Sequence, residues 1–277
     1  MYVIEKTEEL SQGVKSFIVK APRIAKKCQP GQFVILRVDE DGERIPLTIA
    51  DFNRETGTIT LIFQEVGCST RHLGRLQAGQ AILDVAGPLG NASHIDKIGT
   101  VVCIGGGIGV APVYPIARAF REAGNKVVSI IGARNESLLI LEKEMAAVSD
   151  ILHVTTDDGS KGHKGMVVDP LKAMIAAGEK IDLVLAIGPV VMMRGVAEVT
   201  RPYGIKTIVS LNPIMVDGTG MCGGCRVSVG NTNKFACVDG PEFDAHQVDF
   251  NGLMARQRMY LEHEKEERKC GGECSCH

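Results

Sequence analysis

The chain has 277 residues, of which 44% are hydrophobic and 23% are charged, and its formal net charge is −2. This length has room for two ordinary domains and a short appendage, and the near-neutral charge argues against a nucleic-acid partner, which needs a basic surface. The apolar stretches are strand-sized and interrupted by glycine, so we expect no membrane span.

Residues 1–96 consist of short strand-like segments separated by turns. The segments 14–19, 32–38 and 58–64 have strand character. Pro30-Gly31, Asp41-Gly42 and Gly87-Pro88-Leu89-Gly90-Asn91 are the predicted turns. Strands at this spacing, without long helical patterns, predict a small all-β antiparallel barrel. The first six residues lack a basic start and a long apolar core, so we expect no export leader.

Residues 97–212 alternate between apolar strands and helices. The expected strands are 100–104, 126–131, 151–155, 181–187 and 205–210, and the expected helices are 111–123, 137–148, 168–177 and 190–203. The strands are continuous apolar runs, which is typical of strands covered on both faces. This order predicts an α/β doubly wound parallel sheet.

A glycine-rich turn joins the first of these strands to the first helix. Its candidate binding residues are Gly105, Gly106, Gly107, Ile108, Gly109 and Pro112. Glycines let the backbone approach a pyrophosphate, and the free N–H groups of a helix start face its negative charge. The position between a buried strand and a helix therefore predicts a nicotinamide-dinucleotide site, with a tight turn that binds nothing as the alternative.

Two later loops lie where an open α/β sheet binds its ligands, at the carboxyl ends of strands. Thr156, Asp157 and Asp158 follow the third strand, and Gly188-Pro189 follows the fourth. Arg134 follows the second strand, where it either meets a phosphate or is a plain surface arginine. The two aspartates are otherwise explained as a solvated turn.

The nine cysteines are odd in number, and six of them lie between Cys222 and Cys276. A secreted disulfide framework is spread through the fold in even number. Clustered cysteines in a reducing compartment indicate metal binding, so we expect a cytoplasmic protein.

Within residues 213–250 the spacing is Asp-x4-Cys-x2-Cys-x11-Cys, formed by Asp217, Cys222, Cys225 and Cys237. A plant-type [2Fe–2S] loop is Cys-x4-Cys-x2-Cys with a distant fourth cysteine, so every short interval matches. Asp217 stands at the first cysteine position, and a carboxylate is a competent iron ligand. The alternatives are a zinc site and reduced structural cysteines. Residues 251–277 predict a charged helix and a cysteine-rich tail, to which no site is assigned.

The barrel and glycine turn together resemble the ferredoxin-reductase superfamily, in which one barrel strand carries Arg-x-Tyr-(Ser/Thr) against a flavin. This sequence has Arg44-Ile45-Pro46-Leu47-Thr48, so Leu47 and Thr48 match the ring-packing and hydroxyl positions. Arg44 lies one residue before the family's arginine position, which Ile45 occupies. A shift of one residue on a strand directs the side chain to the other face.

A second flavin element of the superfamily resembles Ile62-Phe63-Gln64 followed by Gly67, Ser69 and Thr70. The resemblance implies that Ser69 and Thr70, with nearby backbone N–H groups, hold the flavin pyrophosphate. It also implies that residues 1–96 bind FAD and residues 97–212 bind NAD(P). Many members have Cys-Gly-Pro at the fourth strand, where this chain has Ile187-Gly188-Pro189.

The full order over residues 1 to about 250 resembles the electron-transfer subunit of class B dihydroorotate dehydrogenase. It also resembles the small subunit of NADH-dependent reduced ferredoxin:NADP+ oxidoreductases. Asp217 in place of a cysteine and the Ile45–Thr48 segment favour this second resemblance over the first. That resemblance implies the cofactors FAD, a [2Fe–2S] cluster and NAD(H). The implied partner is a larger, glutamate-synthase-like subunit with another flavin and [4Fe–4S] clusters, which bifurcates electrons and reaches ferredoxin.

Two other functions remain open. The chain would keep the same cofactors if it served a dihydroorotate dehydrogenase. Alternatively, it would be a non-catalytic flavoprotein that senses nicotinamide and carries a structural zinc.

Overall fold

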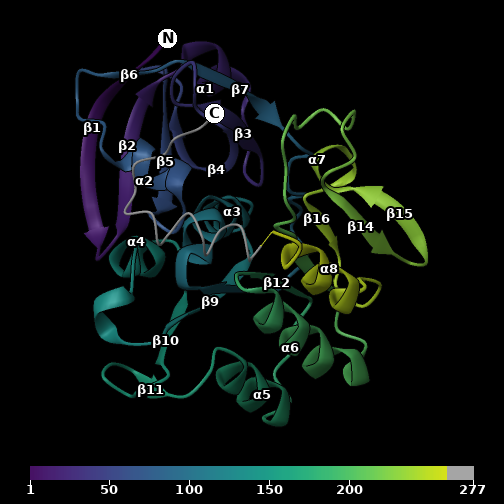
Figure 1. Cartoon of the computed structure of the whole chain (residues 1–277). Coiled ribbons are helices and arrows are strands. Elements are labelled where there is room, and N and C mark those ends of the chain that lie inside the picture. The colour runs from purple at the N-terminus through teal and green to yellow at the C-terminus, as the bar shows by residue number, and fades with distance from the viewer. Residues whose placement is uncertain (261–277) are drawn as a thin grey trace.

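The computed structural model describes residues 1–260 of the chain. Its first part is an antiparallel sheet with the strand order β6-β1-β2-β5-β4-β3-β7. Because β6 and β7 follow each other in the chain yet stand at opposite ends of this order, the sheet nearly closes on itself. The predicted barrel is confirmed (Figure 1). Its elements are β1 (Tyr2–Ser11), β2 (Val14–Lys20), α1 (Pro22–Lys27), β3 (Phe33–Arg37), β4 (Arg44–Asn53), β5 (Thr58–Gln64), α2 (Cys68–Gly74), β6 (Ala81–Ile82) and β7 (Asp84–Leu89).

The second part is the predicted doubly wound sheet, with the order β11-β10-β9-β8-β12-β13-β16. The pairings from β11 through β13 are parallel, and only β16 runs antiparallel to its neighbour β13. The strands are β8 (Thr100–Gly106), β9 (Lys126–Ala133), β10 (Ile151–Thr156), β11 (His163–Lys164), β12 (Leu183–Ile187), β13 (Thr207–Ser210) and β16 (Glu242–Asp244).

Alternate residues of the central strands pack on opposite faces of this sheet. Val102 and Ile104 of β8 pack with helices α5 (Val168–Ala176) and α6 (Val190–Thr200). Val101 and Cys103 pack with α3 (Val110–Glu122) and α4 (Glu142–Ala147). Both faces are therefore covered, which explains why these strands read as unbroken apolar runs.

The predicted helix over 137–148 is shorter than expected. The structure has a 3-10 turn, η2 (Glu136–Leu138), followed by extended chain, and α4 begins only at Glu142. Leu141 separates the two with a left-handed φ of 54°. Leu138 and Ile140 line a cavity that is described below. Their apolar side chains therefore form part of the cavity wall and are not the buried face of a longer helix.

The segment 211–250 has more regular structure than its composition predicts. A hairpin joins β14 (Arg226–Val229) to β15 (Thr232–Phe235), and α7 (Ala236–Asp239) leads into β16. Both turn residues of the hairpin, Gly230 and Asn231, have positive φ, which is the geometry of a tight two-residue hairpin. The structure thus extends the parallel sheet by an edge strand from the cysteine-rich segment.

Helix α8 (Phe250–Gln257) matches the start of the predicted charged helix. The rest of that helix and the Cys270, Cys274 and Cys276 tail lie outside the described residues. Within residues 1–260, no helix has the length and apolar character needed to cross a membrane.

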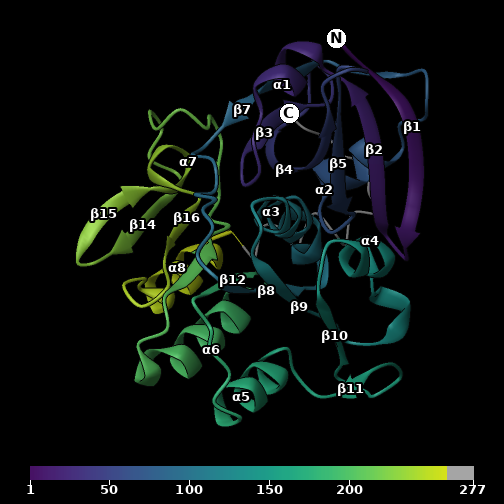
Figure 2. The ribbon, with the colours of Figure 1, turned by 180° about the vertical axis from the view of Figure 1, so that it is seen from behind.

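Helix α3 packs between the two sheets and contacts both. It lies beneath the barrel and above the parallel sheet in both views (Figures 1 and 2). Arg118 of α3 donates a hydrogen bond from Nη2 to Asp51 Oδ1 of β4 at 2.6 Å, and both side chains are about two-thirds buried. The guanidinium also lies 5.3 Å from the centre of the Tyr114 ring. Hydrogen bonding to Asp51 raises the pKa of Arg118, so the guanidinium that links this helix to the barrel stays charged.

Candidate functional site

A cavity of about 960 Å³ lies between the barrel and the carboxyl edge of the parallel sheet. This edge of an open α/β sheet is where ligands bind, because the loops that leave the strands converge there. The cavity brings together residues from both predicted binding regions, which are separate in sequence. The predicted residues that line it are Pro46, Leu47, Thr48, Ile62, Phe63, Gln64, Thr70, Gly106, Gly107, Ile108, Gly109, Pro112, Arg134, Asp157, Gly188 and Pro189.

Three predicted residues of the barrel do not line the cavity. Arg44 is exposed at the start of β4, while Ile45 packs against the barrel core. Ser69 Oγ donates to Glu43 Oε2 at 2.8 Å. Gly67 caps α2, and its N–H donates to Thr70 Oγ1 at 3.0 Å. Of the predicted hydroxyls, Thr48 and Thr70 are therefore the ones at the cavity wall.

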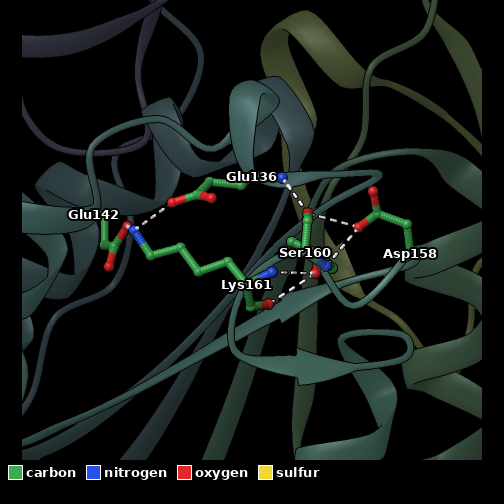
Figure 3. Close-up of polar contacts among 6 residues, drawn as sticks. Glu136, Glu142, Asp158, Ser160 and Lys161 are labelled. Carbon is green, nitrogen blue, oxygen red and sulfur yellow. Dashed lines mark hydrogen bonds and ion pairs between the residues drawn. The ribbon is translucent and has the colours of Figure 1, made fainter.

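Three predicted residues of the second domain also lie outside the lining. Gly105 is buried in β8, where an added Cβ would stand 2.8 Å from Val110 Cα. Thr156 Oγ1 donates to the Lys161 carbonyl at 2.8 Å. Asp158 Oδ1 accepts a hydrogen bond from Ser160 Oγ at 2.7 Å (Figure 3). These residues shape the loops around the cavity and do not form its wall.

The glycine turn between β8 and α3 has two different spatial requirements. Gly107 has a φ of +56°, and an added Cβ there would meet nothing within 4 Å, so it faces open cavity. Gly109 packs against the backbone of β12, where an added Cβ would stand 2.8 Å from Gly188 Cα. Gly109 therefore lets the turn pack against the end of β12, and Gly107 leaves room for a ligand in the cavity.

Several lining residues were not anticipated. Phe33 and Pro241 line the cavity from the barrel and the cysteine-rich segment, and Met192 lines it from α6. A Cβ on Gly188 would stand 2.9 Å from Met192 Cε, and one on Gly106 would collide with Met192 Sδ. In sequence these residues are indistinguishable from ordinary core residues, so only the assembled fold identifies them.

The Asp217–Cys225 loop is built on glycines with left-handed backbone. Gly218, Gly220 and Gly223 have φ values of +76°, +86° and +68°. The carboxylate of Asp217 accepts hydrogen bonds from the N–H groups of Thr219 at 2.5 Å and Cys222 at 2.6 Å. The bond from the Thr219 N–H is the main cause that lowers the pKa of Asp217 to about 2, so this exposed carboxyl is ionised.

The three cysteines of the predicted cluster site, two in this loop and one in α7, differ in exposure. Cys225 and Cys237 are buried, with their Sγ atoms 3.2 Å apart, whereas Cys222 is exposed. Burial, then the neighbouring Cys225, raises the pKa of the Cys237 thiol to about 12. Within residues 1–260, no three metal-ligating side chains already converge on one point. A close thiol pair shared between this loop and α7, with a third thiol and a carboxylate on the loop itself, nevertheless fits the donor set of an iron–sulfur cluster.

This loop packs against the barrel beside the cavity. A Cβ on Gly218 would stand 2.7 Å from Leu89 Cδ1 and 2.8 Å from Ile35 Cγ1, so the loop backbone touches β7 and β3. Just after Cys237, the Val238 carbonyl accepts a hydrogen bond from Asn91 Nδ2 at 3.1 Å. The barrel wall that borders the cavity therefore also holds the cysteine loop.

Two parts of the chain match known protein domains. Residues 103–198 match the oxidoreductase NAD-binding domain, and residues 212–249 match the iron–sulfur cluster binding domain of dihydroorotate dehydrogenase B. A Thermotoga maritima homologue of the dihydroorotate dehydrogenase B (NAD(+)) electron-transfer subunit is 47% identical, over 95% of this chain and 92% of its own. The Bacillus caldolyticus electron-transfer subunit is 36% identical, over 89% of this chain and 94% of its own.

The chain belongs to the dihydroorotate dehydrogenase B electron-transfer subunit family. A chain in the structure of an NADH-dependent reduced ferredoxin-NADP oxidoreductase, studied for flavin-based electron bifurcation, is 45% identical. It superimposes with a TM-score of 0.92 over 97% of both chains. The predicted resemblance to both groups is confirmed, and the chain is an oxidoreductase subunit with the ferredoxin-reductase fold.

Proposed function

We propose that the chain is the electron-transfer subunit of an NAD(H)-, NADP(H)- and ferredoxin-linked oxidoreductase that bifurcates electrons. It exchanges hydride between NAD(H) and FAD in the cavity and passes single electrons through a [2Fe–2S] cluster to a larger subunit. One observation carries the proposal: the barrel wall that lines the cavity also contacts the Asp217–Cys225 loop. When bound, FAD and NAD(H) supply two-electron hydride exchange, and the [2Fe–2S] cluster supplies one-electron transfer.

The cavity residues divide into two sets by domain. On the barrel, Leu47 and Phe63 offer apolar surface for a flavin ring, and Thr48 and Thr70 offer hydroxyls. On the parallel sheet, the turn from Gly106 to Gly109 accepts the pyrophosphate of the dinucleotide. Because both sets face one cavity, the chain would hold a flavin ring and a nicotinamide ring in proximity.

The proposed partner is a larger, glutamate-synthase-like subunit that carries another flavin and [4Fe–4S] clusters, and ferredoxin is reached only through it. Exposed apolar side chains surround the exposed Cys222 and support such a contact. They are Ile214, Val216, Met221 and Val238, and Met221 is 87% exposed. Apolar residues around a redox site on an otherwise polar surface are typical of a protein interface. We place the complex in the cytoplasm, where clustered cysteines stay reduced.

Purification with the native partner tests this proposal. A co-purifying glutamate-synthase-like flavoprotein is the expected result. A barrel-type dehydrogenase would instead support the alternative function in dihydroorotate oxidation, which the names of the 47% and 36% identical relatives favour. Stoichiometric zinc without iron would support the nicotinamide-sensing alternative.

Asp217→Cys is expected to retain a cluster but to change its reduction potential, because thiolate is a softer ligand than carboxylate. Redox titration followed by EPR measures this change. Asp217→Asn is the matched control, since it removes the charge and one of the two acceptor oxygens, and keeps an oxygen that can accept from either the Thr219 or the Cys222 N–H group, without introducing a thiolate. An unchanged spectrum and potential in Asp217→Cys would remove Asp217 as a ligand.

Arg118→Gln is expected to slow flavin reduction by NADH about tenfold, because small errors in the relative placement of reactants cost rate. Stopped-flow absorbance measures the rate. Arg121→Gln removes the same charge from the same helix, but the partner of Arg121 is Asp150, on the parallel-sheet side of the molecule. Equal rates in the two variants would show that the Arg118–Asp51 pair does not orient the two domains.

A further inference from the structure

The end of helix α8 holds the backbone between two of the proposed cluster ligands. Arg256 Nη2 donates a hydrogen bond to the Gly224 carbonyl at 3.1 Å. Gly224 lies between Cys222 and Cys225 in the chain, and its own N–H donates to Cys222 Sγ at 3.4 Å. Gly224 is therefore held on one side by a thiol of the predicted cluster site and on the other side by α8.

Helix α8 is itself fixed beside the cysteines. Phe250 and Leu253 on its apolar face are buried. They belong to the apolar cluster that also contains Cys225 and Cys237. The helix packs against α6 and against β14, which begins directly after Cys225 (Figure 1). A packed helix thus presents Arg256 to the cysteine loop.

The Arg256 guanidinium brings a permanent positive charge to this loop. An arginine side chain stays protonated in proteins, and solvent screens the charge of a partly buried side chain less than that of a fully exposed one. An iron–sulfur cluster gains one negative charge on reduction, and its potential depends on nearby charges and hydrogen bonds. A neighbouring cation therefore stabilises the reduced form more than the oxidised form, which raises the reduction potential.

The next residue of α8 connects the same helix end to the cavity. Gln257 Nε2 donates to the Asn212 carbonyl at 2.9 Å and to Asn212 Oδ1 at 3.1 Å. Asn212 lines the cavity. Because Gln257 is uncharged, it anchors the end of α8 without adding charge. The chain therefore offers a way to separate the anchoring of α8 from the charge of Arg256.

Given the cluster of the proposed function, we propose that Arg256 is a positioning residue for it. Arg256 holds the Gly224 backbone between two ligands and raises the reduction potential of the cluster through its charge. A higher potential makes one-electron transfer from a reduced flavin to the cluster more favourable.

Redox titration followed by EPR, on protein isolated with its native partner, tests this proposal without relying on turnover. In Arg256→Gln we expect iron to be retained and the potential to fall. The equilibrium constant for cluster reduction should drop about tenfold, which corresponds to about 59 mV for one electron. Arg256→Lys keeps the charge and a donor, so its potential should lie closer to that of the wild type than to that of Arg256→Gln.

Two matched controls lie on the same helix end. Arg258 is exposed at the C-cap of α8, and side chains two residues apart on a helix do not face the same side. Arg258→Gln removes the same charge away from the cysteine loop. Gln257→Ala loosens the helix end without removing a charge. Both variants should keep the wild-type potential.

An unchanged potential in iron-loaded Arg256→Gln would overturn the proposal, and so would an equal fall in either control. If Arg256→Gln lost its iron, recovery of iron in Arg256→Lys would support the proposal, and continued loss would overturn it. Wild-type protein without iron would instead contradict the proposed function itself.

Discussion

Cys225→Ser is expected to yield protein that retains FAD but contains neither iron nor acid-labile sulfide. Cys225 is 1% exposed, and its Sγ lies 3.2 Å from that of Cys237, so it is one of the two closely paired thiols of the predicted cluster site. A serine hydroxyl is a much weaker ligand for iron than a thiolate. The flavin should stay because its proposed contacts are all on the barrel. Iron and sulfide analysis with visible and EPR spectroscopy measures the outcome.

The matched control is Cys103→Ser. Cys103 is also buried, but it lies inside β8 and packs against α3 and α4, away from the loop. Burial raises the pKa of its thiol to about 12, in keeping with a passive core residue. This variant should keep its iron, even where the added polar atom lowers stability. Wild-type levels of iron and sulfide in Cys225→Ser would contradict the assignment of the cluster to this loop.

Gly107→Val is expected to weaken NADH binding by about a hundredfold, or roughly 2.7 kcal/mol, with FAD content unchanged. The added side chain would project into the open cavity where the pyrophosphate is proposed to lie. The φ of +56° adds backbone strain for a β-branched residue. Titration of NADH against the flavin absorbance, under anaerobic conditions, gives the affinity.

Gly178→Val separates strain from steric exclusion. Gly178 has a φ of +72° and also has nothing within 4 Å of an added Cβ, but it lies in the exposed turn after α5. This variant should lose a similar amount of stability and keep the wild-type affinity for NADH. If both variants bound NADH equally well, the glycine turn would not be the pyrophosphate site.

The two domains could be predicted from the sequence because their patterns are local. Strand-length segments between turns indicate a barrel, and apolar strands alternating with helices indicate a doubly wound sheet. The helix predicted over 137–148 was too long, because Leu138 and Ile140 have helical spacing but serve the cavity wall. The β14–β15 hairpin was missed, although its Gly230-Asn231 pair is a usable turn signal.

The candidate site was less predictable, because side chains meet there from distant parts of the chain. The one-residue offset of Arg44 was visible in the sequence, and the structure places that side chain outside the cavity lining. By contrast, Met192 and Phe33 have no distinguishing pattern, and only the packing of α6 and β3 brings them to the cavity.

Electron transfer from NADH through the flavin to the cluster is tested by an anaerobic NADH titration of the complex isolated with its native partner, followed by absorbance and EPR on the same sample. We expect the flavin absorbance to bleach and a reduced two-iron EPR signal to appear, and we expect this signal to be lost in Cys225→Ser. A natively isolated chain that is colourless, with neither flavin nor iron, would contradict it.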